Sequence, residues 1–243
     1  MLRIALALSL FSLAARASPE VEPPPLAQIV ARAAQLVAKK PDGLVCPVEM
    51  EAEQLDSGGK KEHETRAQTE VTLRGAEQDE AVIRQWNDGK ELTQRELVEQ
   101  DKKRAKAKSE GKDRDAEMKE PIDQPDKFRF ALLRTESLWG RPAFVLSAAP
   151  LAEGSEELKG TLWIDATSFV ELKAELSPAK NPDHVDWMKV QLQAGLHSSG
   201  AVVPTLVHVE GAGHFLLFHK GFRFTQRWGE CRAAPSETRA TPG

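Results

Sequence analysis

The chain has 243 residues, a formal net charge of −4 and 40% hydrophobic residues, which is enough for one large globular domain. Its acidic balance excludes a protein built to coat nucleic acid, because binding to phosphates requires an excess of Lys and Arg. After the N-terminal region, no segment has the about 20 consecutive apolar residues that a membrane-spanning helix needs.

The N-terminal residues have the pattern of a secretion signal. Arg3 supplies the positive charge, residues 4–15 form an apolar run, and Ala15-Arg16-Ala17 places small residues at a cleavage site. Residues 1–17 are therefore expected to be a signal peptide, cleaved after Ala17, that directs the protein to the periplasm. An uncleaved anchor is the alternative. Residues 18–25 are rich in Pro and Glu and are expected to form a flexible leader.

Residues 26–37 have the spacing of an amphipathic helix. Apolar residues recur at i, i+3, i+4 and i+7, and they are Leu26, Ile29, Val30, Ala33, Leu36 and Val37. Asp42-Gly43 should stop the chain from continuing as a helix. A single amphipathic helix must bury its apolar stripe, and the inner face of a following sheet is the expected place.

Three strands are predicted next, followed by a highly charged segment. Residues 44–55, 60–73 and 80–86 have strand character, with turn signals at 57–59 and 87–89. Residues 96–120 are expected to be a solvated helix or insertion between strands. A basic patch that contacts anionic lipid or a partner protein is the alternative for this insertion.

From Phe128 to Trp228 the sequence predicts an antiparallel meander, because strands follow one another without intervening helices. The clearest alternation is in residues 170–176, where Glu171 and Glu175 are expected to face solvent. Turns are expected at 139–142, 197–200 and 211–213. The residues predicted for the inner face, lining a ligand cavity or filling a core, are Val170, Leu172, Leu176, Val190, Leu192, Val207 and Val209.

The two cysteines, Cys46 and Cys231, are expected to form a structural disulfide if the protein is exported. No catalytic motif is present in the sequence, so no enzyme activity and no cofactor are expected. His208, Glu210 and His214 could share one face of a hairpin, as zinc ligands do. Exposed positions on the outer face of a sheet are the preferred interpretation, so no metal site is predicted.

The order of these elements resembles the bacterial LolA/LolB-like superfamily of outer-membrane lipoprotein carriers, in particular exported proteins described as lipoprotein-sorting-like. The resemblance covers residues 44–230 in outline. It rests on three short segments, which are Gly140-Arg141-Pro142-Ala143, the Gly-Thr-Leu-Trp-Ile-Asp strand of residues 160–165, and Leu216-Leu217-Phe218. No functional residue of the carriers is assigned to this chain.

The resemblance implies an α+β fold that is mainly antiparallel β. The expected architecture is a curved, incomplete β-barrel, with the N-terminal helix and a helical insertion packed on or near its open face. Residues 26–232 would form this single domain and residues 233–243 a disordered tail. The implied function is non-enzymatic binding of lipoprotein acyl chains, or another apolar ligand, by a periplasmic monomer. An envelope protein-interaction or sensor domain on the same fold is the alternative.

Overall fold

The computed structural model describes residues 23–75, 77–109, 120–152, 154, 157–215 and 218–234. The predicted signal peptide of residues 1–17 lies outside the described residues. So do residues 18–22 of the predicted leader, residues 110–119 of the charged insertion and residues 235–243 of the predicted tail.

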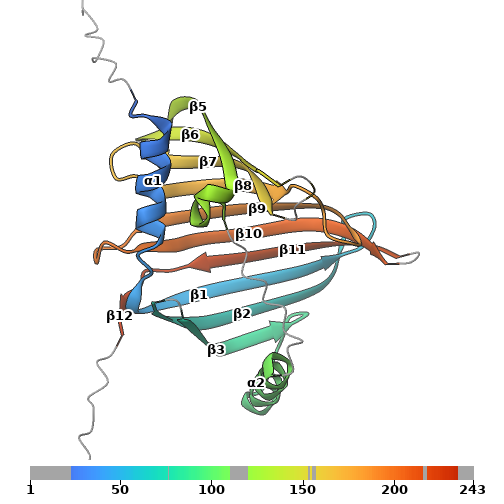
Figure 1. Ribbon diagram of the computed structural model, residues 1–243. Helices are drawn as coiled ribbons and strands as arrows, with labels where there is room; N and C mark the ends of the chain where they lie inside the picture. Colours follow the sequence, from blue (N-terminus) through green and yellow to red (C-terminus); the bar gives the residue numbers. More distant parts are fainter. Residues whose placement is uncertain are drawn as a thin grey trace, which may run out of the picture.

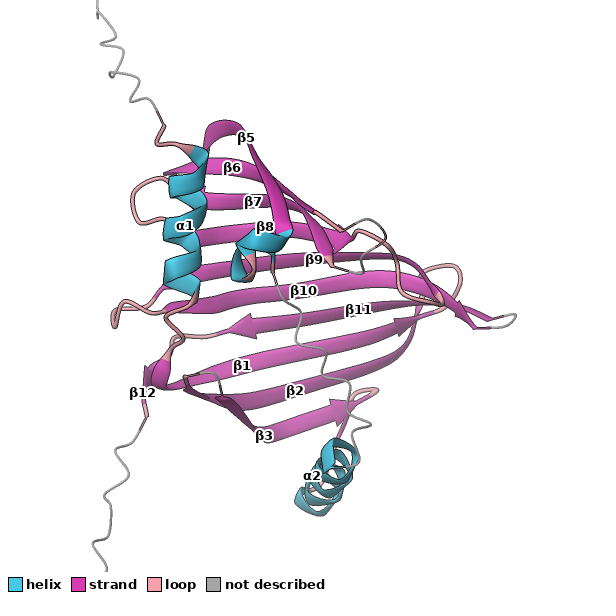
Figure 2. Cartoon of the chain, viewed as in Figure 1, coloured by secondary structure: helices cyan, strands magenta, loops and turns pink. Residues whose placement is uncertain are grey.

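Within the described residues, twelve strands form one antiparallel sheet (Figures 1 and 2). The strands are β1 Asp42–Leu55, β2 Lys61–Arg74, β3 Glu77–Asn87, β4 Lys90–Glu91, β5 Phe128–Leu138, β6 Arg141–Pro150, β7 Leu158–Asp165, β8 Glu171–Pro178, β9 Val185–Leu196, β10 Val202–Phe215, β11 Phe218–Trp228 and β12 Arg232–Ala233.

The sheet runs in the order β4-β3-β2-β1-β11-β10-β9-β8-β7-β6-β5, and β12 pairs with β1. The first long strand therefore lies beside the last long strand, with Val48 opposite Trp228. The strands β4 and β5 stand at opposite ends of the order, so the sheet is open and curved (Figure 1). The predicted α+β fold with a curved, incomplete barrel is confirmed.

The helix α1, Leu26–Val37, lies across one face of the sheet, which we call the inner face (Figure 1). Its residues share one hydrophobic core with strands β5 to β10, because the apolar stripe of the helix and the inner face of the sheet exclude water from each other. The buried members of this core include Ile29, Val30, Ala33, Phe144, Leu146, Leu162, Ile164, Leu176, Val190 and Val209.

Three helical elements lie between β4 and β5. The helix α2, Gln94–Ser109, stands beside the β3 end of the sheet (Figure 2) and buries Leu97. The 3-10 helix η1, Pro121–Asp123, packs against α1 and buries Ile122, and η2, Pro125–Lys127, leads into β5. None of the described helices is long and apolar enough to span a bilayer.

The predicted disulfide between Cys46 and Cys231 is confirmed. It joins β1 to the residue that precedes β12, and it is buried in a second apolar cluster with residues such as Val48, Val71 and Leu73. The start of β1 is therefore held to the C-terminal segment by a covalent bond as well as by its pairing with β12.

The prediction that Glu171 faces solvent is wrong. Trp163 lies opposite Lys173, but Ile164 lies opposite Glu171, which leaves Leu172 as the extra residue of a β-bulge. Because a shift of one residue exchanges the two faces of a strand, Glu171 turns to the interior and is only 5% exposed. Glu175, beyond the bulge, is exposed as predicted.

The predicted turn at residues 211–213 is also wrong, because strand β10 continues through this segment to Phe215. The glycines serve close packing. A Cβ atom at Gly211 would lie 2.6 Å from Cζ of Phe222, and one at Gly213 would lie 2.3 Å from the carbonyl oxygen of His184. Glycine in a strand interior often marks such a close approach.

Gly160, which begins the Gly-Thr-Leu-Trp-Ile-Asp strand, has the same role. A Cβ atom there would lie 2.0 Å from the carbonyl oxygen of Glu175 in the adjacent strand β8. We expect Gly160→Ala to lower the free energy of unfolding by about 2 kcal/mol, since the backbone of one strand must move. Urea unfolding would measure this. Gly200→Ala is the control. Gly200 also has a positive φ, but a Cβ atom there would meet open space, so this variant has the backbone strain without the clash.

Candidate ligand-binding site

The seven residues predicted for the inner face fall into three groups. Leu176, Val190 and Val209 are buried in the core beneath α1. Leu192 and Val207 are half-buried, pack against that core and line a cavity. Val170, just before β8, and Leu172 of β8 are buried but are not part of that core cluster.

The cavity lies where the end of α1 and the segment around η1 meet strands β8, β9 and β10, and its volume is about 190 Å³. This volume is below the roughly 300–1,000 Å³ of typical ligand pockets. Most of the wall is apolar, and its apolar residues include Val37, Leu73, Leu192, Val202, Pro204 and Val207.

One end of the cavity is acidic. Glu171 of β8 and Glu120, which precedes η1, both line it, and their carboxyl groups share a hydrogen bond. Burial raises the pKa of Glu171 well above its ordinary value, and the negative charges of Glu120 and Asp123 raise this pKa further. Burial also raises the pKa of Glu120, although its hydrogen bond with Glu171 opposes the shift. Of the two carboxyl groups, Glu171 therefore holds a proton more readily than Glu120 does.

The η1 segment is held in place from both sides of the cavity. The backbone N–H of Glu120 donates to Oδ2 of Asp123 at 3.1 Å, which fixes the start of the short helix. Nζ of Lys40, just after α1, lies 3.7 Å from Oδ1 of Asp123. The segment thus connects α1 to β8 through charged groups at the mouth of the cavity and through the buried pair inside it.

Sequence reasoning did not identify Glu120 and Glu171 as a pair. Glu120 lies at the end of the charged insertion, and Glu171 occupies a position whose alternation predicts an exposed side chain. The bulge that turns Glu171 inward depends on how β7 and β8 pair, and no residue in the sequence marks it.

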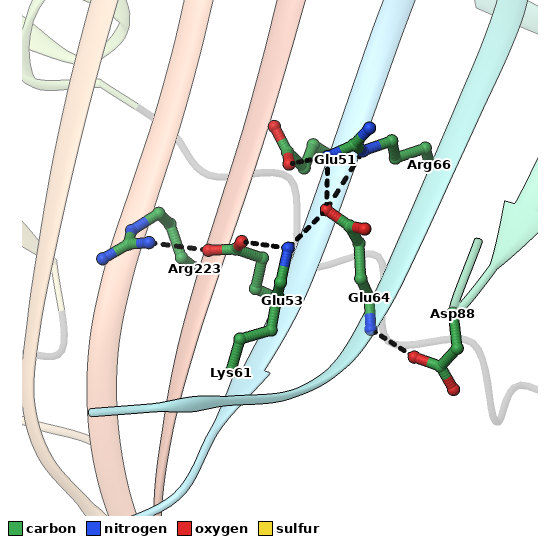
Figure 3. Close-up of polar contacts among 7 residues, drawn as sticks. All are labelled: Glu51, Glu53, Lys61, Glu64, Arg66, Asp88 and Arg223. Carbon is green, nitrogen blue, oxygen red and sulfur yellow. Dashed lines mark hydrogen bonds and ion pairs between the residues drawn. The ribbon is translucent and has the colours of Figure 1, made fainter. Parts of the chain in front are cut away.

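A separate group of carboxylates lies on strands β1 and β2, where Glu51, Glu53 and Glu64 approach one another (Figure 3). In the described part of the chain, this is the group of acidic residues, histidines or cysteines that is close enough to hold a metal ion. Three cations neutralise it. Lys61 Nζ lies 2.8 Å from Glu64 Oε1, Arg66 Nη2 lies 2.7 Å from the same oxygen, and Arg223 Nη1 lies 2.6 Å from Glu53 Oε2. The group is therefore an ion-pair network.

The histidines considered as zinc ligands each have a different partner. His208 Nδ1 lies 2.9 Å from Oγ1 of Thr225, and His214 Nδ1 lies 2.5 Å from Oδ1 of Asp186. Glu210 forms an ion pair with Lys189 at 3.7 Å. The three side chains do not converge on a common point.

The fold can now be compared with known proteins. A domain from Vibrio parahaemolyticus described as an outer membrane lipoprotein-sorting protein is 12% identical over 87% of this chain and 92% of that chain, with a TM-score of 0.38. A LolA superfamily protein from Nitrosomonas europaea is 12% identical over 88% and 97% of the two chains, with a TM-score of 0.35.

A chain of the MucA/MucB complex of Pseudomonas aeruginosa is 11% identical over 86% of this chain and 99% of that chain, with a TM-score of 0.26. No protein-family model matches the sequence, and no curated protein matches it either. Because the identities and TM-scores are this low, the function must be argued from the cavity and the side chains of this chain.

Proposed function

We propose that this protein is a periplasmic, non-enzymatic binding protein for lipoprotein acyl chains or another apolar ligand. The observation that supports the proposal is the cavity of about 190 Å³ on the inner face, where apolar side chains of α1, β9 and β10 form most of the wall. A concave, mostly apolar site with a few polar groups is typical of small-molecule binding.

Binding of a long acyl chain would require more room than the cavity offers, and α1 is the element that can provide it. The helix contacts the sheet through an apolar stripe, with Ile29, Val30 and Ala33 buried against the core. An acyl chain that replaces this stripe would recover similar apolar contacts, at about 25 cal/mol per Å² of buried area. We therefore propose that α1 moves aside as the ligand enters next to Leu192 and Val207.

The test is native mass spectrometry, with lipid extraction, on protein purified without detergent from a bacterial periplasm. We expect a co-purified acyl lipid with the wild-type protein and its loss in Leu192→Glu, because a charge in the cavity wall opposes burial of an acyl chain. Leu196→Glu is the matched control. It lies on the same strand, is 49% exposed and is outside the cavity, so this variant should retain the lipid. A homogeneous ligand-free wild-type mass, unchanged by added lipids, would contradict the proposal.

A protein-interaction or sensor function is the second candidate, and the position of α2 favours it. The helix stands beside the β3 end of the sheet (Figure 1). Its lysines Lys102 and Lys103 are exposed. An acidic partner could bind there without entering the cavity. Under this alternative, Lys102→Glu with Lys103→Glu should weaken partner capture from an envelope extract, while Leu192→Glu should leave it unchanged.

A further inference from the structure

The carboxyl group of Glu171 has a feature that an acyl chain does not explain. The side chain lines the cavity and is only 5% exposed. Apart from the contact between its carboxyl group and that of Glu120, its Oε2 atom has no hydrogen-bond partner in the described part of the chain. Buried polar atoms of native proteins nearly always have a partner. Most of the remaining wall is apolar, so a ligand with a hydrogen-bond donor would satisfy this oxygen.

The charges around the cavity favour a donor that is also a cation. Glu120, Asp123 and Glu171 bring three carboxyl groups, and Lys40 at the mouth is the cation that contacts them, through Asp123. Lys173 also contributes to the wall, but its ammonium group turns away. That group lies 2.6 Å from Oε1 of Glu175 and 4.7 Å from the centre of the Trp163 ring. The cavity therefore keeps an excess of negative charge.

A metal ion does not fit this site. In the described residues, the carboxyl oxygens of Glu120, Asp123 and Glu171 are not all within the 4.8 Å that would allow them to share an ion, since the group that meets this distance is Glu51, Glu53 and Glu64. Hard cations also require about six or more oxygen ligands, whereas the remaining wall is mostly apolar.

We propose that the Glu171 end of the cavity binds the primary ammonium head of an amphiphile, whose apolar portion lies against Val37, Leu192 and Val207. This inference rests on the proposed apolar-ligand function and specifies the ligand class. The ammonium group donates to Oε2 of Glu171 and to the Glu120 carboxylate. Charge-assisted hydrogen bonds of this kind are stronger than neutral ones and are further strengthened by burial.

Binding of the ammonium group replaces the proton that Glu171 and Glu120 share. The proton leaves to solvent and the ligand brings one positive charge, so the net charge of the site does not change. The charged groups around Glu171 in the cavity wall are Glu120 and Asp123 from the η1 segment, Lys40 from the segment after α1, and Lys173 of β8, whose ammonium group turns away to Glu175. Because the empty site holds an extra proton, the affinity for an ammonium ligand should rise with pH until the carboxyl pair is fully ionised.

The experiment compares octylammonium, octanol and octanoate by titration calorimetry with the full mature chain. The two ionic probes are kept below their critical micelle concentrations and octanol below its solubility limit. Octyl chains are chosen because the empty cavity is only about 190 Å³. We expect octylammonium to bind about tenfold or more tightly than octanoate. The binding enthalpy is measured at about pH 5 in two buffers of different ionisation enthalpy, because the difference between the two values gives the number of protons released on binding. We expect release of about one proton per octylammonium bound and of none per octanol bound.

Glu171→Gln keeps the shape of the side chain but removes its charge, so it should lose the preference for octylammonium and retain octanol binding. Retained octanol binding also shows that this variant is folded. Glu175→Gln, on the same strand but exposed and outside the cavity, is the matched control and should keep the wild-type preference. Equal binding of octylammonium and octanol by the wild type, or an unchanged preference in Glu171→Gln, would overturn the inference and leave the proposed function intact. Binding of none of the three probes would contradict both.

Discussion

Replacement of both Cys46 and Cys231 by alanine is expected to lower the free energy of unfolding by about 5 kcal/mol, because the disulfide closes a very long loop. The two residues are separated by 185 positions in the sequence. In the chain-entropy description, the bond restricts the unfolded ensemble, and this restriction grows with the length of the loop. The folded sheet should remain, since β1 also pairs with β11 and β2.

Urea unfolding of Cys46→Ala with Cys231→Ala, compared with the wild type, measures the effect. The wild type in reducing buffer is the control and should show nearly the same midpoint as the double variant. The slope of the transition should increase in both, because the unfolded chain without the bond exposes more surface. A loss of less than about 1 kcal/mol would contradict the expected role of the bond.

The second large effect is expected at Asp165, where substitution by alanine should cost about 3 kcal/mol. This carboxylate is 1% exposed at the end of β7. It accepts hydrogen bonds from the backbone N–H of Ser168 at 2.6 Å, from Ser168 Oγ at 2.8 Å and from the N–H of Thr167 at 3.1 Å. Nε of Arg141 lies 2.9 Å from its other oxygen. Alanine would leave these donors and the cation without their buried partner.

The pH dependence of stability gives an independent readout for Asp165. Burial alone would raise the pKa of this carboxyl, but the hydrogen bonds from Ser168 and Thr167 and the charge of Arg141 lower it below its ordinary value. The folded state therefore binds its proton less readily than the unfolded state does. The stabilisation is present above the unfolded pKa and is lost as the pH falls through the folded pKa.

We expect Asp165→Asn to retain part of the stability at neutral pH and to show a weaker loss in acid than the wild type. Asp126→Ala is the control, because this exposed aspartate of η2 should change stability by no more than about 0.5 kcal/mol. Thermal unfolding between about pH 3 and about pH 7 would test both expectations. An Asp165→Ala variant as stable as Asp126→Ala would show that the turn after β7 does not depend on this carboxylate.

Local patterns in the sequence were sufficient for the elements that depend on local periodicity. The helix of residues 26–37, the alternating strands and the pairing of Cys46 with Cys231 follow from spacing, composition and cysteine count. The acidic end of the cavity does not, because it depends on contacts between segments distant in the sequence. Glu171 faces inward because β8 has a bulge where it pairs with Trp163 and Ile164 of β7. Its partner Glu120 comes from the charged insertion.

The glycines of β10 show the same limit in another form. A glycine pair such as Gly211 and Gly213 usually indicates a turn, because glycine adopts left-handed backbone conformations easily. Here the missing side chains make room for the Phe222 ring and for the backbone at His184. Whether a glycine serves a turn or close packing is decided by the neighbouring strand, which the sequence alone does not identify.

The pairing of β1 with β11 also determines the order in which this sheet can be assembled. Strands β5 to β11 are joined to their neighbours by successive hairpins, so each can pair as soon as the next strand has been synthesised. The unit β1 to β3 can form its own hairpins early, but it has no place in the sheet until β11 exists. Contacts of such long sequence separation slow folding. During synthesis, the edge of β1 that pairs with β11 therefore remains without a partner strand until nearly the whole chain has left the ribosome.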